Sequence, residues 1–122
     1  MKKLTHAEEQ IMQVLWELEK GFVNDIVAQL SDPKPAYNTV STIVRILEQK
    51  GFIGHKAYGR THEYYPLVKK EEYRKTFMKD VVNDYFGSSY KNVVSFFVDE
   101  KKLNANDLKK LIEIIEKGKD NE

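Results

Sequence analysis

The sequence predicts a mainly helical protein with one β hairpin near its middle. Apolar residues recur at three- and four-residue spacing before and after this hairpin, which is the periodicity of amphipathic helices. Residues 52–57 and 61–66 are rich in aromatic and β-compatible residues and flank Tyr58-Gly59-Arg60, which indicates two strands and a turn. Pro66 ends the second strand. We therefore expect two domains, residues 1–67 and 68–122, each small for a stable core.

The composition excludes several classes of protein. The chain has 122 residues and no cysteine, so it forms no disulfide and no thiolate metal site. It contains no apolar run of the length that spans a membrane, and its N-terminus lacks the apolar segment of a signal peptide. We therefore expect a cytoplasmic protein that does not insert into a membrane.

Three helices are expected before the hairpin, at residues 5–19, 23–30 and 37–50. Thr5 and Glu8 form a capping box at the start of the first helix, and Gly21 is placed to end it. The proline-containing segment 31–35 separates the second helix from the third. Gly51 stands where the third helix needs a left-handed cap.

Three more helices are expected after the hairpin, at residues 69–86, 89–101 and from 105 onward. Gly87 is placed to end the first of them, Ser88 to cap the second and Asn104 to cap the third. Their apolar stripes are wide, and about fifty residues cannot easily bury such stripes alone. We therefore expect a homodimer, with an interface that contains Phe77, Val81, Tyr85, Phe86, Val94, Phe97, Leu111 and Ile115. The alternative is a compact monomeric subdomain packed on the N-terminal domain.

The third helix has a polar side without acidic residues. Its apolar side carries Val40, Ile43, Val44 and Leu47, and its opposite side carries Asn38, Ser41, Thr42, Arg45 and Gln49. Between residues 33 and 62 the chain has five basic side chains and one acidic side chain, although the whole protein has a net charge of only +1. Such a face can meet water or the edges of bases, and a local basic patch suits phosphate contacts.

Three helices followed directly by a two-stranded hairpin form the order of a winged helix-turn-helix, whose third helix enters the major groove of DNA. We therefore expect a winged helix-turn-helix domain that binds double-stranded DNA, followed by a three-helix dimerisation domain. Some winged helices instead serve as protein-interaction modules without a DNA role. Salt-dependent, sequence-selective DNA binding distinguishes the two classes.

Each candidate DNA-binding residue of the third helix has a chemical role. Asn38 can read adenine, and Arg45 can read guanine or hold a phosphate. The methyl groups of Thr39 and Thr42 can contact thymine. Tyr37 and the helix N-terminus can hold a phosphate. The alternative is that Thr39 caps the helix and Asn38 belongs to a turn.

The tip of the hairpin has the residue types of a phosphate contact. Lys56 and Arg60 flank Gly59, which lets the tip approach a DNA backbone closely. The alternative is that both charges are merely solvated. With this pair, the candidate DNA-binding set extends from the third helix to the hairpin.

Neither a catalytic site nor a cofactor or metal is expected. His6, His55 and His62 are too scattered for a metal site, because the two hairpin histidines have no third ligand nearby. The sequence contains no nucleophile elbow, phosphate-binding loop or HExxH motif. Acidic residues of the C-terminal half alternate with lysines, which is typical of exposed helix faces. We therefore expect a binding protein rather than an enzyme.

Four segments are fairly specific in their order and spacing: LTHAEEQIMQVLWE, YNTVSTIVRILEQKGFI, YGRTHEYYPLV and NVVSFFVDEKKLNANDLKKL. In these segments the chain resembles the BlaI/MecI/CopY (penicillinase repressor) family of bacterial transcriptional repressors. The resemblance extends over nearly the whole chain. The resemblance implies a homodimer that binds palindromic operators through a winged-helix domain. The recognition residues of the family fall on Asn38, Thr39, Ser41 and Thr42.

The resemblance also implies a mode of regulation. In the β-lactam-responsive members, a membrane-bound sensor metalloprotease system leads to cleavage of the repressor in its fifth helix. The corresponding bond here joins Phe96 and Phe97, whereas relatives usually have Asn before the Phe. Relief by a small-molecule effector is the alternative. Copper-responsive members use a cysteine-rich site, which this chain lacks.

The third helix departs from the family pattern at one position. Many relatives have Arg directly before the Leu that aligns with Leu47, where this chain has Ile46. Its arginine stands one residue earlier, at Arg45, which turns the side chain by about 100° around the helix. We therefore expect Arg45 to make a different contact from the arginine of the family.

Overall fold

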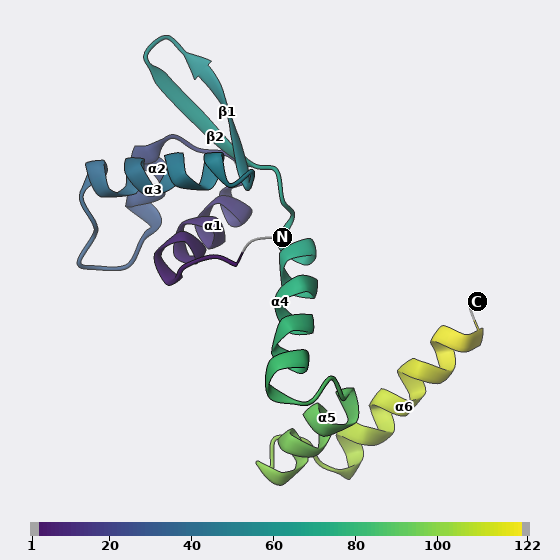
Figure 1. Ribbon diagram of the computed structural model, residues 1–122. Coiled ribbons are helices and arrows are strands. Elements are labelled where there is room, and N and C mark those ends of the chain that lie inside the picture. The colour runs from purple at the N-terminus through teal and green to yellow at the C-terminus, as the bar shows by residue number, and fades with distance from the viewer. Residues whose placement is uncertain (1–2, 121–122) are drawn as a thin grey trace. The chain divides into compact units, whose positions relative to one another are not determined.

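The computed structural model describes residues 3–120, and their order of elements is the one expected for a winged helix-turn-helix followed by three helices (Figure 1). The elements are α1 (His6–Leu18), α2 (Val23–Gln29), α3 (Tyr37–Gln49), β1 (Ile53–Tyr58), β2 (Thr61–Pro66), α4 (Lys70–Tyr85), α5 (Tyr90–Asp99) and α6 (Ala105–Asp120). The chain divides into two compact units, Met1–Phe77 and Met78–Glu122, so the division falls inside α4.

The first unit has one hydrophobic core built from all its elements. Side chains of α1, α2 and α3 that are fully buried meet Phe52 and Ile53 at the start of the hairpin; they are Ile11, Met12, Leu15, Ile26, Val40, Val44 and Leu47. The spacing of these residues is the apolar periodicity from which the helices were predicted. The helices therefore form because each can bury one face in this core.

Tyr73 explains why the first unit extends into α4. Its hydroxyl oxygen accepts a hydrogen bond from the Leu4 N–H at 3.2 Å, and its ring centroid lies 5.9 Å from those of Trp16 and Phe52. The side chain is buried. The first turn of α4 is thus part of the N-terminal core, whereas the expected boundary between the two domains lies before α4, between residues 67 and 68.

The ends of α1 show one confirmed prediction and one wrong one. The Thr5 Oγ1 atom accepts from the Glu8 N–H at 3.2 Å, and Glu8 Oε1 accepts from the Thr5 N–H at 3.1 Å, which is the predicted capping box. Gly21 does not end the helix, because Glu19 is the cap and takes a φ of 71°. Gly21 instead exchanges two backbone hydrogen bonds with Tyr64, at 2.9 and 2.8 Å, and so adds a bridge to β2.

A buried ion pair joins the start of α1 to the end of α3. The Lys50 Nζ atom donates to Glu8 Oε1 at 2.7 Å and lies 2.7 Å from Oε2. Burial alone would raise the pKa of Glu8, but the hydrogen bonds from Lys50 and Thr5 outweigh it and hold this pKa below its ordinary value. The carboxylate is therefore ionised in the folded protein at neutral pH.

This pair makes stability dependent on pH. Because folding lowers the pKa of Glu8, its contribution is complete above the unfolded-state pKa and is lost as the pH falls below about 4. Glu8→Gln should lower the free energy of unfolding by about 1–3 kcal/mol at pH 7 and by much less at pH 3. Urea titrations at the two pH values measure this. Glu9→Gln, in the same helical turn, is the control, and an equal loss in both variants would contradict the assignment.

The hairpin has a two-residue turn and connects directly to α3. Gly51 has a φ of 82°, which is the left-handed conformation predicted after the third helix. The strands pair antiparallel from Ile53 opposite Pro66 to Tyr58 opposite Thr61. Gly59, in the turn, has a φ of 63°, which an L side chain rarely adopts. The hairpin is therefore placed by the end of α3 and by its bridge to Gly21.

The second unit exposes many apolar side chains. Those at least one third exposed include Met78, Tyr85, Tyr90, Val94, Phe96, Phe97, Val98, Leu111, Ile112, Ile114 and Ile115. Ser89 caps α5, because its Oγ accepts a hydrogen bond from the Asn92 N–H at 3.2 Å. The prediction that Ser88 caps this helix is wrong, because Ser88 takes a φ of 60° in the preceding turn. Asn104 caps α6 as predicted, with its Oδ1 2.9 Å from the Asp107 nitrogen. Within residues 3–120, no helix is long and apolar enough to cross a membrane.

Candidate nucleic-acid interface

The outward side of α3 is the centre of the candidate interface. Val40, Val44 and Leu47 are fully buried, which turns the opposite side of the helix away from the core. Exposed on that side are Asn38, Thr39, Thr42, Arg45, Ile46 and Gln49. The predicted acid-free polar side therefore exists, with one apolar residue among its members.

Ser41 was expected on this outward side and is instead buried. Only 9% of its surface is exposed, and its Oγ accepts a hydrogen bond from Arg45 Nη2 at 3.0 Å. Residue 41 lies between the apolar side and the outward side of the helix, so neighbouring elements decide its burial. A direct contact of Ser41 with a base is therefore disfavoured, and it holds the Arg45 side chain along the helix.

The start of α3 leaves backbone N–H groups without a side-chain cap. The N-cap is Ala36, so the alternative assignments of Thr39 as a cap and Asn38 as a turn residue are wrong. The first turn contains no acidic residue, and Tyr37 beside it is half exposed. Uncapped N–H groups at the positive end of the helix dipole suit an anion such as a phosphate.

The hairpin, or wing, carries two more cations. Lys56 and Arg60 are exposed, and the Lys56 Nζ atom lies 5.3 Å from the centroid of the Tyr58 ring. Two other bases of the 33–62 stretch have internal partners, because Lys34 donates to carbonyls at the end of α2 and Lys50 pairs with Glu8. The basic patch therefore reduces to Arg45 on α3 and the two wing residues.

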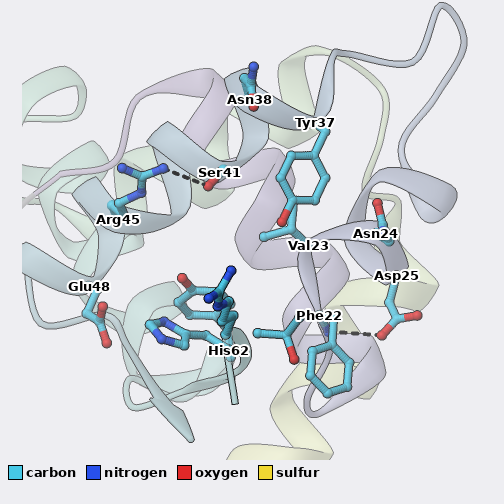
Figure 2. Close-up of a pocket in the computed structure, with 13 residues that line it drawn as sticks. Phe22, Val23, Asn24, Asp25, Tyr37, Asn38, Ser41, Arg45, Glu48 and His62 are labelled. Carbon is cyan, nitrogen blue, oxygen red and sulfur yellow. Dashed lines mark hydrogen bonds between the residues drawn. The ribbon is translucent and has the colours of Figure 1, made fainter. Parts of the chain in front are cut away.

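An open groove of about 840 Å³ separates α3 from the wing and the start of α2. Asn38, Ser41, Arg45 and Glu48 line it from α3, and Arg60 and His62 line it from the wing. Figure 2 shows the hydrogen bond between Arg45 and Ser41 on one wall, with Tyr37 and Val23 beyond it. The groove thus brings together residues from the helix and the wing that the sequence placed separately.

Two histidines connect the wing to α3, which sequence reasoning missed. His55 Nδ1 forms an ion pair with Glu48 Oε2 when the imidazole is protonated, and the His55 and His62 rings stack with centroids 4.1 Å apart. The Tyr64 ring lies near both rings, edge-on to that of His62, and burial together with the Glu48 charge raises the pKa of its hydroxyl. Only the register of the hairpin reveals this cluster. In the part of the chain that the structure describes, no three His, Asp or Glu residues are arranged to hold a metal.

The predicted dimer and cleavage residues lie on the helices of the C-terminal half, except Phe86, which directly follows α4. Phe77, Tyr85, Val94, Phe97, Leu111 and Ile115 are exposed, whereas Val81 and Phe86 are partly buried. The Phe86 ring packs on Phe96 with centroids 5.6 Å apart. Phe96 and Phe97 both lie within α5, so the bond between them is helical. Both assignments remain predictions.

Comparisons with known proteins agree with this geometry. The profile of the family described as penicillinase repressor matches residues 4–117. The methicillin resistance regulatory protein MecI of Staphylococcus aureus (strain N315) is 24% identical over 116 residues, which cover 94% of each chain. The penicillinase repressor of Bacillus licheniformis is 24% identical over 98% of this chain and 96% of that protein.

A solved structure resembles the N-terminal part. The solution structure of the DNA-binding domain of the repressor BlaI covers 60% of this chain and 94% of its own, with 28% identity and a TM-score of 0.51. The family profile and the full-length relatives extend the similarity to nearly all residues. The chain therefore belongs to the penicillinase repressor family, a family of DNA-binding transcriptional repressors rather than of enzymes.

Proposed function

We propose that the protein represses transcription by binding a palindromic DNA operator as a homodimer in the bacterial cytoplasm. In this proposal α3 enters the major groove and the wing contacts the phosphate backbone. The observation that carries it is the outward side of α3, which is exposed and free of acidic residues, with the wing cation Arg60 lining the same groove as Asn38 and Arg45. A solvated helix face needs neither property, because acidic side chains are equally stable there.

The contacts divide into two classes. Asn38 and Arg45 have the geometry to read base edges, as both are exposed and both line the groove that opens toward the wing. Lys56, Arg60, and the uncapped start of α3 beside Tyr37 are suited to phosphates, which position the protein without reading sequence. The two classes have different experimental signatures.

Two alanine variants test this division. Asn38→Ala should weaken binding to the preferred operator about 5- to 150-fold, with little effect on unrelated DNA, because a base contact is lost. Lys56→Ala should weaken binding to all sequences and lower the slope of log affinity against log salt concentration by about 1. Fluorescence anisotropy across a salt series measures both effects.

Lys75→Ala is the matched control, because Lys75 is an exposed lysine on α4 in the same unit as the wing. It should leave the affinity and the salt slope close to those of the wild type. If the wild-type protein shows no sequence-selective, salt-dependent binding at all, it is a protein-interaction module instead.

The exposed apolar side chains of the C-terminal helices support the homodimer. A second copy related by a twofold axis would cover them and would present two α3 helices about 34 Å apart to the two halves of a palindrome. Linking two half-sites multiplies the affinity of each. Loss of the dimer would therefore release the operator without any change in α3.

Cleavage between Phe96 and Phe97 is the proposed route of release, by a protease system with a membrane-bound sensor. The bond lies within α5, so this helix must open locally before a protease can accept it in an extended form. A cut there would separate Phe97 from the residues before it and divide the proposed dimer surface. An intact repressor throughout induction, seen by immunoblot, would contradict this route.

A further inference from the structure

The outward side of α3 has two chemically different edges. Asn38 and Arg45 line the groove toward the wing, together with the buried Ser41 and with Glu48, which pairs with His55. This edge is therefore polar and carries charges of both signs. Thr39, Thr42 and Ile46 are also exposed but do not line that groove. They follow one another at three- and four-residue spacing, which places them on one line along the helix, away from the wing.

Ile46 is the unusual member of this second edge. The core side of α3 is fully buried through Val40, Val44 and Leu47, whereas 39% of Ile46 is exposed. The side chain therefore adds little to the core. Single apolar residues on a surface are common and need no explanation by themselves. This one lies on the surface that the proposed function places in the major groove.

Thr42, four residues before Ile46, is also less polar than its residue type suggests. Its hydroxyl donates to the Asn38 carbonyl oxygen within the helix, at 2.9 Å. The hydroxyl hydrogen is thus already used, and the group has no second hydrogen to donate to a base. What Thr42 adds to the edge beyond this bond is its methyl group. Together, Thr42 and Ile46 offer carbon rather than hydrogen-bond donors.

We propose that Ile46, next to the Thr42 methyl group for which the sequence already suggested a thymine contact, contacts the C5-methyl group of a thymine and thereby sets part of the operator sequence. This inference rests on the proposed function. In the major groove only thymine carries a methyl group, and apolar side chains recognise it by excluding water from both surfaces. Ile46 therefore selects thymine over cytosine at one position of each half-site, while the polar edge with Asn38 and Arg45 reads hydrogen-bonding groups nearby.

Uracil substitution tests this contact directly. Uracil pairs as thymine does but lacks the methyl group, so it removes the proposed contact and nothing else. The operator is first obtained by selection from random duplex DNA with the full-length protein. Each thymine of one half-site is then replaced by uracil in turn, and the affinity is measured by fluorescence anisotropy for the wild type and for Ile46→Ala.

At one or two positions, uracil should weaken binding of the wild type about fourfold, the effect of one buried methyl group. Ile46→Ala should bind the thymine operator more weakly than the wild type and should show no further loss with uracil at the position that Ile46 contacts. A position contacted by the Thr42 methyl group should keep its sensitivity to uracil in this variant. Leu67→Ala is the control, because Leu67 is an exposed aliphatic residue of the same unit outside α3. It should keep the full sensitivity to uracil.

The outcomes separate this inference from the proposed function. If the wild type selects no sequence, the proposed function fails. If it selects an operator but uracil has no effect, or if Ile46→Ala keeps the full sensitivity to uracil, the repressor stands and the methyl contact is wrong. Because Ile46 is outside the core, circular dichroism should show Ile46→Ala folded, so a loss of affinity reports on the interface.

Discussion

Phe52→Ala is expected to lower the free energy of unfolding of the N-terminal unit by about 3–5 kcal/mol. Phe52 joins α3 to β1, and only 1% of its surface is exposed. Its ring packs against Tyr73, with centroids 5.9 Å apart. The backbone of Phe52 bonds to Leu47 at 3.0 Å and to Leu67 at 2.8 Å, and these bonds do not depend on the side chain. The substitution therefore leaves the turn in place and opens a cavity under α3, the wing and α4.

Trp16 makes this loss measurable in the relevant unit. It is the single tryptophan of the chain, its ring lies 5.9 Å from that of Tyr73, and its Nε1 donates to the Val68 carbonyl oxygen at 2.9 Å. Urea unfolding followed by its fluorescence reports on the first unit. Leu67→Ala, at a side chain that is 56% exposed, should change stability by no more than about 0.5 kcal/mol. A cost below 1 kcal/mol for Phe52→Ala would show that this core is not closed as described.

The elements were predictable because their signals are local. The capping box at Thr5 and Glu8 spans one helical turn, and the left-handed residue at Gly51 follows from the end of a helix. Apolar periodicity indicates the buried face of a helix when all the apolar residues on that face lie in one hydrophobic core. This holds for α1 and α3, whose predicted apolar residues lie in the core.

What the sequence did not reveal depends on partners distant along the chain. Gly21 looked like the end of a helix because its role, a bridge to Tyr64, involves a strand more than forty residues later. Tyr73 looked like part of a C-terminal domain because the residues it contacts, Leu4 and Phe52, precede the hairpin in the sequence, whereas Tyr73 follows it. Local spacing contains no information about such contacts, which arise only when the elements pack.

In the candidate interface, too, the locally determined features were predictable and those that depend on packing were not. The pattern on α3 placed Asn38, Thr42 and Arg45 on the outward side correctly, because helical geometry alone decides it. It placed Ser41 there too, because residue 41 lies at the border where neighbouring elements decide burial. The pairing of His55 with Glu48 could not be predicted, because it depends on how the hairpin packs against α3.

Ile115→Glu is expected to dissociate the proposed dimer and to weaken binding to a full palindrome about 100-fold or more. Leu111 and Ile115 lie on one stripe of α6 and are exposed, with Ile115 at 60%. A glutamate at the centre of an apolar interface would be a charge without a partner, which association cannot tolerate. Because residue 115 is outside the first unit, binding to an isolated half-site should not change.

Ile114→Glu makes this test specific. Ile114 is the neighbouring residue, is 65% exposed and has the same side chain, but it lies off the stripe by about 100° of helical rotation. Both variants add one negative charge at nearly the same place, so a general effect of charge on DNA binding would appear in both. Analytical ultracentrifugation gives the dimer constant, and anisotropy with full and half operators gives the affinities. Equal losses of affinity in the two variants would contradict an interface on this stripe. A loss of affinity in Ile115→Glu alone, seen only with the full palindrome, would establish that the C-terminal helices act on DNA binding only by joining two copies of α3.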